Sequence, residues 1–404
     1  MAVRDTITIW QAMEQVSNCG RLTESEIIPV TEALGRILAE DVSTRIAQPP
    51  FPRSAMDGYA VNAEDTREAS ADRPIHLTVA GVQYAGDAYF RPLQRGEALR
   101  IMTGAAIPEG ADAVVRQEDT DYGEERVTIY AGVTCGENYC EIGEDFPQGD
   151  LLARAGDPID AYLIAAAVAG GIDTFSVRKR IRAAMISTGD ELQSPGSALD
   201  EGKIYDSNLA LFSSHLKQLG CDVEIAVSVG DQLDLLKDSI RQAADRCDLI
   251  LTTGGVSVGV KDLLPEAVEQ LGADKIFHGI SIKPGMPTMF SVLDGVPILS
   301  LSGNPYSAAA VFELLVQPLC RTMTASKKEV LRKVEGVAQD RFDKKTFCTR
   351  FLRGYYREGR LSFSRGQRNG MTKAGIGSNC LICLEAGRGP VEIGDVLTAY
   401  LMMD

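Results

Sequence analysis

Apolar runs and amphipathic segments alternate in the middle of the chain. Four short apolar runs bounded by turn residues predict buried strands: residues 181–186, 223–229, 249–251 and 297–301. Four segments with apolar positions three and four residues apart predict helices: residues 209–219, 233–244, 263–271 and 308–319. This order predicts an α/β domain with a doubly wound parallel sheet and right-handed crossovers.

The segment before this domain begins with helical spacing. Ile9, Met13 and Val16 fall on one helical face, and an apolar stripe occupies residues 26–41. A second helix is predicted at residues 159–169, an alanine-rich stretch that closes on two glycines suited to a C-cap. These segments together predict a helical stalk.

Two other segments are β-rich. Residues 45–145 contain short strand-like runs, such as 76–81 and 126–130, separated by Gly, Pro and Asp turns. Residues 327–404 have the same β-rich pattern of short strand-like runs. The predicted organisation has four parts: a helical stalk domain (1–44 and 146–176), an inserted β-rich domain (45–145), an α/β domain (177–326) and a C-terminal β-barrel-like domain (327–404).

Composition narrows the class of protein. Lys and Arg total 41 against 56 Asp and Glu, and a net charge of −15 argues against a general nucleic-acid binder. It leaves room for a small anionic ligand at a locally positive site. No apolar run predicts a membrane span or a signal peptide, and nine scattered cysteines are typical of a reducing compartment. We therefore expect a cytoplasmic protein without membrane partners.

The loop after the third predicted strand is the most informative segment. Residues 248–259 read as a strand, a loop of glycines and hydroxyls, and the approach to a helix, which presents backbone N–H groups to an anion. Lys283-Pro-Gly-Met-Pro287 and Ser302-Gly-Asn-Pro305 follow within about sixty residues, so we expect one binding edge of one sheet. Pro305 suits the first position of a helix.

Polar residues follow the predicted strands. Ligands of doubly wound sheets bind outside the carboxyl ends of the strands, so five residues are candidates to face one crevice: Glu191, Asp206, Asp231, Ser257 and Asp262. Each alone is more typical of a turn or a helix cap than of a binding site, by about two to one, and Ser207 or Asn208 is a candidate cap of the following helix. Carboxylates beside an anion site predict a bridging Mg²⁺, and Lys283 supplies a positive charge.

The β-rich insertion offers a second group of polar turn residues. Asp57 lies in Ser54-Ala-Met-Asp-Gly-Tyr-Ala60, Thr103 follows Arg100-Ile-Met, and Asp145 ends Gly143-Glu-Asp145. Turn chemistry alone explains any one of them.

The ordered set of these motifs resembles the molybdopterin molybdenumtransferase family, which includes the C-terminal domain of gephyrin. The resemblance covers nearly the whole chain and also rests on Ser187-Thr-Gly-Asp-Glu-Leu and Ile204-Tyr-Asp-Ser-Asn. It implies a homodimer of elongated subunits that inserts molybdate-derived molybdenum into adenylylated molybdopterin, assisted by Mg²⁺, and releases AMP. It also implies an active site between the α/β domain of one subunit and the β-rich domain of the other.

The resemblance assigns roles to residues at the matching positions. It implies catalytic roles for seven residues: Asp57, Thr103, Asp145, Glu191, Asp231, Asp262 and Lys283. The implied metal ligands are Glu191, Asp231 and Asp262. The implied substrate-binding residues are Gly189, Asp206, Asn208, Gly254, Gly255, Ser257, Gly259, Ser302, Gly303, Asn304 and Pro305. Molybdopterin adenylyltransferase and apo-molybdoenzymes are the implied partner proteins.

Three positions depart from the family pattern. Met286 replaces a lysine, Ser302 replaces a proline, and residues 138–142 lack the usual arginines. Loss of one charge-assisted hydrogen bond is expected to lower affinity or rate about tenfold to a hundredfold. Lys261 and Arg116 are candidates to restore the lost positive charge.

These departures keep two alternatives open. One is a diverged paralogue that binds molybdopterin or a partner protein without efficient turnover, or that uses tungstate. The other is a different enzyme on the same α/β domain, such as a nucleotide hydrolase, although the flanking β-rich domains disfavour it.

Overall fold

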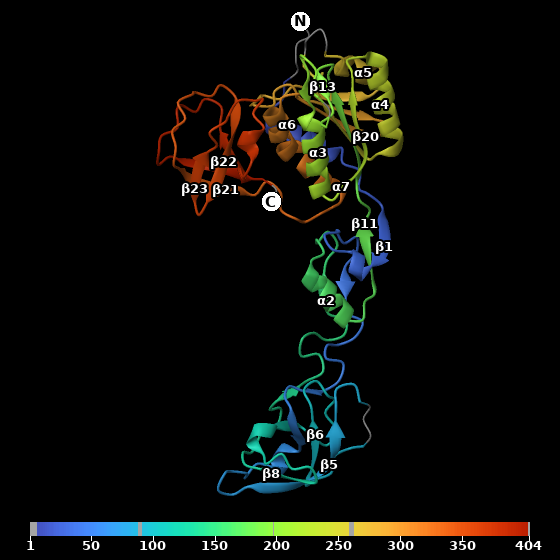
Figure 1. Cartoon of the computed structure of the whole chain (residues 1–404), viewed down its shortest axis with the longest axis vertical. Coiled ribbons are helices and arrows are strands. Elements are labelled where there is room, and N and C mark those ends of the chain that lie inside the picture. The colour runs from blue at the N-terminus through green and yellow to red at the C-terminus, as the bar shows by residue number, and fades with distance from the viewer. Residues whose placement is uncertain (1–5, 88–90, 197, 258–261, 403–404) are drawn as a thin grey trace.

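The computed structural model describes residues 6–87, 91–196, 198–257 and 262–402. Figure 1 shows an elongated molecule with the β-rich insertion at one end. The α/β domain and the C-terminal barrel lie side by side at the other end, and a narrow stalk joins the two ends. Within the described residues, no helix is both long and apolar enough to cross a membrane.

The α/β domain contains the predicted parallel sheet. Its parallel strands lie in the order β15 (Asp222–Val229), β12 (Arg182–Thr188), β16 (Leu249–Thr253) and β20 (Val296–Leu301). Every residue of β16 is buried, which explains its uninterrupted apolar and small-polar sequence.

An antiparallel pair extends this sheet at one edge and was not predicted. β19 (Met289–Leu293) pairs antiparallel with β20, and β17 (Asp274–His278) pairs antiparallel with β19. Asp294 and Gly295 join β19 to β20 with positive φ angles of 52° and 83°. An Asp-Gly turn between two apolar runs is a strong hairpin signal, so the sequence did contain the information.

Helices cover both faces of the sheet. One face carries α3 (Ser207–Gln218) and a continuous helical segment made of α6 (Pro305–Val311), η4 (Phe312–Val316) and α7 (Gln317–Met323). The other carries α4 (Leu233–Arg246) and α5 (Leu264–Gln270). The four predicted helices and the doubly wound arrangement are confirmed. The N-terminal helix α1 (Ile9–Asn18) also packs on the α3 face, through Ile9, Ala12 and Val16, although the prediction placed it in the stalk.

The stalk contains less helix than the sequence predicts. α2 (Ala161–Ala169) forms as expected, with Asp160 as its N-cap and Gly170 as its C-cap. The helix predicted at residues 26–41 is wrong: β1 (Ser25–Pro29) pairs with β11 (Thr174–Arg178), followed by the short turn η1 (Val30–Glu32). Alternate residues of β1 are exposed, and Pro29 removes a helix donor, so strand pairing prevails.

The β-rich insertion is built on one five-stranded sheet. The strand order is β7 (Ala113–Arg116), β4 (Gly58–Val61), β6 (Glu97–Ile101), β5 (Ile75–Gln83) and β8 (Arg126–Ile129). Short pairs join it to the stalk: β3 (Arg53–Ser54) with β9 (Tyr139–Cys140), and β2 (Val42–Ser43) with β10 (Leu151–Ala153).

The C-terminal sheet confirms the predicted barrel. Its strands are β21 (Lys333–Ala338), β22 (Thr349–Arg357), β23 (Arg360–Phe363), β24 (Cys380–Leu384) and β25 (Val396–Leu401). A pairing of β22 with β24 closes it. One strand of this sheet comes from the α/β domain: β18 (Ile282–Lys283) pairs parallel with β22. The two domains are therefore joined through a shared sheet.

Candidate functional site

The carboxyl ends of β12 and β16 meet a buried carboxylate. Ser187 Oγ donates to Asp206 Oδ1 over 3.1 Å and lies 3.0 Å from Thr253 Oγ1. Asp206 Oδ1 also accepts from the Leu209 backbone N–H at 2.9 Å. Asp206 is therefore the cap of α3, and the expectation that Ser207 or Asn208 caps it is wrong.

The other oxygen of Asp206, Oδ2, is buried without a hydrogen-bond partner among the described residues. Asp206 as a whole is only 6% exposed. A buried, unpaired carboxylate oxygen is costly, so a ligand donor or a cation at this oxygen would be stabilised.

The glycine-rich loop after β16 is packed backbone against backbone. Gly254 and Gly255 have φ angles of +89° and +57°, which only glycine adopts readily. A Cβ at Gly254 would lie 2.2 Å from the Thr188 carbonyl oxygen, and one at Gly303 would lie 3.5 Å from the Gly254 Cα. The Gly254 turn is thus packed against the end of β12 with no room for a side chain, and the turn at Gly303 lies in van der Waals contact with it, an arrangement suited to a phosphate cradle.

Two further contacts fix these loops. The Asn208 amide donates to the Gly303 carbonyl at 2.8 Å and ties α3 to the turn at residues 302–305. In that turn the Asn304 N–H donates to Ser302 Oγ at 3.3 Å, and α6 begins at Pro305 as predicted. His278 Nε2 lies 2.8 Å from the Val256 carbonyl and holds the glycine loop. No role was predicted for His278 from the sequence.

The carboxylates after β12 and β15 are bonded to each other's backbone. The Asp231 N–H donates to Asp190 Oδ1 at 2.9 Å, and Thr188 Oγ1 donates to Asp231 Oδ1 at 3.3 Å. Glu191 folds back over Gly189, where a Cβ would lie 2.5 Å from Glu191 Oε2. Asp190, which the sequence analysis did not select, is thus the residue that positions Asp231.

The predicted metal ligands do not form a protein-only metal site. Among the described residues, no three His, Cys, Asp or Glu side chains are grouped to hold a metal, so Glu191, Asp231 and Asp262 do not converge. Mg²⁺ commonly binds through one or two carboxylates together with substrate phosphates. The hard oxygens of Asp231 and Asp206 fit that mode. Ser257 ends the described part of the loop, and Gly259 and Lys261 lie outside the described residues.

Lys283 has a basic neighbour that the sequence analysis missed. In the parallel pairing of β18 with β22, Lys283 is in register with Arg350, and register partners project to the same face. Arg350 Nε is buried and has no hydrogen-bond partner among the described residues. Two cations on one face are suited to an oxyanion.

The turn after Lys283 is seated against α6. Gly285 has a φ of +110°, and a Cβ there would lie 2.5 Å from Val311 Cγ2. Met286 follows with its side chain 42% exposed, while its carbonyl accepts from the Thr288 N–H at 2.9 Å. The hydrogen bonds of this turn thus involve the Met286 backbone, while its side chain is partly exposed to solvent.

The polar residues of the β-rich insertion form a separate group. Asp57 Oδ1 accepts from the Thr103 backbone N–H at 2.8 Å and from Thr103 Oγ1 at 2.7 Å. Asp145 lies on the exposed connection to the stalk, where its N–H donates to the Gln48 carbonyl. Arg116 is engaged with Asp119 at 2.9 Å, so its charge is already partly neutralised.

Hydrogen bonds from Thr103 hold the pKa of Asp57 below its usual value, the backbone N–H contributing most and the hydroxyl next. Asp57 therefore takes up its proton at a lower pH than an ordinary aspartate does. Replacing Thr103 by valine removes the hydroxyl donor and is expected to raise the pKa of Asp57 toward the usual value. Carbon-13 NMR titration of the Asp57 carboxylate measures this change.

A second aspartate of the β-rich insertion, Asp121, serves as the control. The pKa of Asp121 is raised by burial but lowered overall by hydrogen bonds, including one from the Thr128 N–H. It should not change in the Thr103→Val protein. An unchanged pKa at Asp57 would contradict the proposed contribution of the Thr103 hydroxyl.

The two groups of candidate residues lie far apart in one chain. Asp57 and Thr103 flank the sheet of the β-rich insertion, whereas Asp206, Gly254 and Lys283 belong to the opposite end of the molecule (Figure 1). The structure therefore links Asp206, Gly254 and Gly303 through contacts between neighbouring loops and, separately, pairs Asp57 with Thr103. It does not bring these two groups together within one subunit.

Comparison with known proteins gives matches along almost the whole chain. Residues 7–171 match a family described as the MoeA N-terminal region (domain I and II), and residues 184–322 match one described as a probable molybdopterin binding domain. A molybdopterin molybdenumtransferase of Haemophilus influenzae is 34% identical over 383 residues, which cover 93% of each chain. One from Bacillus subtilis is 33% identical over 364 residues, 89% of this chain and 85% of that protein.

Solved structures show the same similarity. The crystal structure of a molybdopterin biosynthesis moeA protein from Pyrococcus horikoshii superimposes with a TM-score of 0.86 at 30% sequence identity, covering 99% of this chain and 100% of that one. A second structure from that organism gives a TM-score of 0.82 at 27% identity.

Proposed function

Because the chain belongs to the molybdopterin molybdenumtransferase family, we propose that it inserts molybdenum from molybdate into adenylylated molybdopterin and releases AMP. Its role as a transferase of molybdenum-cofactor biosynthesis follows from family membership. The observation that carries the finer proposal is the tightly packed glycine loop beside Asp206. The loop presents backbone without side chains, which suits a phosphate, and Asp206 has a buried, unpaired carboxylate oxygen, which suits a cation.

Each group of residues has a distinct task in this proposal. The loops at Gly254 and Gly303 hold the phosphates of the substrate, and Asp231, positioned by Asp190, orients the attacking water. That water forms a bond to phosphorus, and the phosphoanhydride bond to AMP breaks. Lys283 and Arg350 hold the molybdate oxyanion by charge-assisted hydrogen bonds. Mg²⁺, when bound with the phosphates, supplies charge neutralisation.

We further propose a homodimer whose active site combines both subunits. The observation that supports it is the apolar surface of α2, in which only Ala167 is buried. Tyr162 is 87% exposed and Val168 is 55% exposed on this stalk helix. An apolar face of this kind is typical of a protein interface. Pairing of two elongated subunits would let the Asp57–Thr103 pair of one meet the α/β site of the other.

Replacing Tyr162 by lysine is expected to convert the dimer to a monomer, because a charge buried without a partner in an interface is strongly unfavourable. Analytical ultracentrifugation at micromolar concentration measures the change, and molybdenum insertion should be lost with it. Phe347, 89% exposed on the C-terminal barrel, supplies the matched control. Phe347→Lys should remain dimeric, and a dimeric Tyr162→Lys protein would contradict the interface.

The reaction itself is tested by incubating the protein with adenylylated molybdopterin, Mg²⁺ and either molybdate or tungstate. AMP release that depends on the oxyanion is expected. Release without any oxyanion, and from ADP as well, would favour a nucleotide hydrolase. Absence of AMP release with both oxyanions would contradict turnover and favour a paralogue that only binds molybdopterin.

We also propose a cytoplasmic location, with molybdopterin adenylyltransferase as the supplier of the substrate and apo-molybdoenzymes as acceptors of the product. The nine cysteines, all free in the structure, support a reducing compartment.

A further inference from the structure

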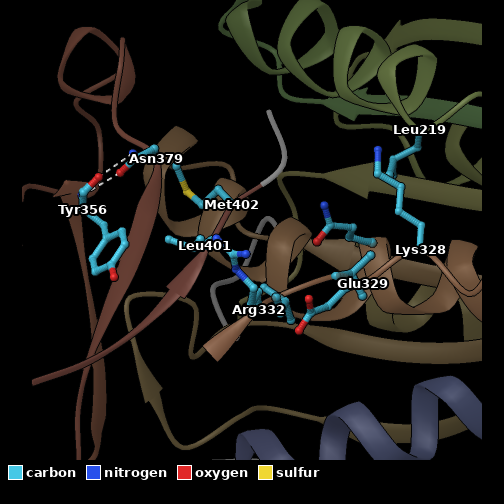
Figure 2. Close-up of a pocket in the computed structure, with 11 residues that line it drawn as sticks. Leu219, Lys328, Glu329, Arg332, Tyr356, Asn379, Leu401 and Met402 are labelled. Atoms are coloured by element: carbon cyan, nitrogen blue, oxygen red, sulfur yellow. Dashed lines mark hydrogen bonds between the residues drawn. The ribbon is translucent and has the colours of Figure 1, made fainter. Parts of the chain in front are cut away.

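Two adjoining hollows lie where the stalk, the α/β domain and the segment leading into the C-terminal barrel meet. Their volumes are about 460 Å³ and about 210 Å³, and they share four lining residues: Leu219, Gln317, Lys328 and Val330. Figure 2 shows the larger one, with Tyr356 on β22 and Asn379, just before β24, at one side and Leu219 with Lys328 at the other. The candidate functional site described above contributes no lining residue to either hollow.

The smaller hollow is lined by an unusual number of cations. Its basic residues come from all three parts of the chain: Arg36, Arg178, Lys179, Arg180, Arg321 and Lys328. Among the described residues that line it, none is acidic. The chain as a whole is negative, with a net charge of −15, so this hollow is a locally positive region of a negatively charged protein.

Nearby carboxylates and helix ends neutralise only part of the positive charge of these six residues. Arg36 pairs with Glu26 at 2.5 Å, and Lys179 pairs with Glu24 at 2.8 Å. The C-terminal ends of α3 and α7 also border the hollow and together contribute roughly one negative charge. Roughly three positive charges therefore remain after these partners and helix ends are taken into account.

Two buried polar groups at the hollow lack partners. Gln317 is only 3% exposed, and its Oε1 has no hydrogen-bond partner among the described residues. The Nε of Arg178 is buried and equally unpaired within the described chain. The two residues that carry this acceptor and this donor both line the smaller hollow, and a ligand that offers both an anionic oxygen and a hydroxyl suits them.

We propose that the joined hollows bind a phosphorylated small molecule. The phosphate lies in the smaller hollow against Arg178, Arg321 and Lys328, and the remainder extends past Gln317 toward Tyr356. Arg178 belongs to the stalk, Arg321 to α7, and Lys328 to the segment that enters the barrel. The bound molecule therefore links three parts of the subunit and fixes the stalk relative to the α/β domain.

Isothermal titration of the full-length protein with inorganic pyrophosphate tests the site. Lys328→Gln is expected to raise the Kd about tenfold or more, since it removes a charge-assisted contact. Lys327→Gln is the matched control, because the adjacent lysine pairs with Asp157 at 3.5 Å and does not line the hollow. Its Kd should stay within about twofold of wild type. Arg321→Gln, a second variant, should weaken binding like Lys328→Gln.

The proposed active site also attracts anions, with phosphate at the Gly254 loop and an oxyanion at Lys283, so Gly254→Ala and Lys283→Gln together serve to separate the two sites. Binding that persists in both of these variants and weakens in Lys328→Gln supports the proposal. Absence of pyrophosphate binding, or equal binding by wild type, Lys328→Gln and Arg321→Gln, overturns it. Binding lost only in Gly254→Ala or Lys283→Gln assigns the anion to the active site; it overturns this proposal and leaves the proposed transferase reaction intact.

Discussion

Replacing Lys283 by alanine is expected to lower kcat/KM for molybdate-dependent AMP release about 10- to 100-fold, the effect of losing one charge-assisted hydrogen bond to an oxyanion. Arg350→Ala should have a similar effect, because Arg350 is in register with Lys283 and carries an unpaired, buried Nε. The double variant is expected to lose more than either single variant. Steady-state kinetics at varied molybdate concentration measures these effects.

A distant lysine controls for the general loss of charge. Lys275 is exposed on β17 of the same sheet, and Lys275→Ala should keep kcat/KM within about twofold of wild type. If Lys283→Ala and Arg350→Ala behave like Lys275→Ala, the oxyanion does not bind at this pair. In that case neither Lys283 nor Arg350 would compensate for the missing positive charge at Met286, and the oxyanion would have to bind elsewhere.

Replacing Gly254 by alanine is expected to have the largest effect on the fold and to abolish substrate binding. Its positive φ alone costs an L-residue about 1–2 kcal/mol. Its Cβ would also lie 2.2 Å from a backbone oxygen, which cannot rotate away, and such overpacking adds about 1–3 kcal/mol. The cradle must open to admit the methyl group, so the phosphate loses its backbone donors.

Gly272→Ala is the control that separates the cost of the steric clash from the cost of the positive φ. Gly272 also has a positive φ, +76°, but nothing lies within 4 Å of a Cβ built there. Urea unfolding followed by the fluorescence of Trp10 reports on this part of the molecule, because Trp10 is the single tryptophan and contacts Tyr400. Gly272→Ala should cost about 1–2 kcal/mol and leave activity intact. Equal costs for the two variants would contradict the packing of the cradle.

The elements that the sequence predicts correctly are those specified by local pattern. The four parallel strands and their helices follow from short apolar runs and a helical period, which need no information about distant residues. The glycine loop, Asp206 and Pro305 were found because strand ends and helix starts are themselves local features. The failure at residues 26–41 has a non-local cause: pairing with β11 stabilises a strand that the apolar stripe alone did not reveal.

The residues that the sequence analysis missed all depend on contacts between distant segments. Arg350 is a candidate only because β18 joins the sheet of the C-terminal barrel. His278 acts on the glycine loop from an antiparallel edge strand that was not predicted. Asp190 was passed over in favour of its neighbour Glu191, although its carboxylate is the one that bonds the Asp231 backbone. No pattern within a short window contains these relations.

The central claim is that one active site is built from two subunits, and mixing two inactive variants tests it most directly. Asp57→Ala inactivates the part of the active site that the β-rich insertion supplies. Lys283→Ala/Arg350→Ala inactivates the part that the α/β domain and the barrel supply. In a random mixture, half of the dimers are mixed and one of their two sites is intact, so AMP release should recover to roughly a quarter of wild type. Recovery to that level is the predicted result. A mixture no more active than its separate components would show that each site lies within a single subunit.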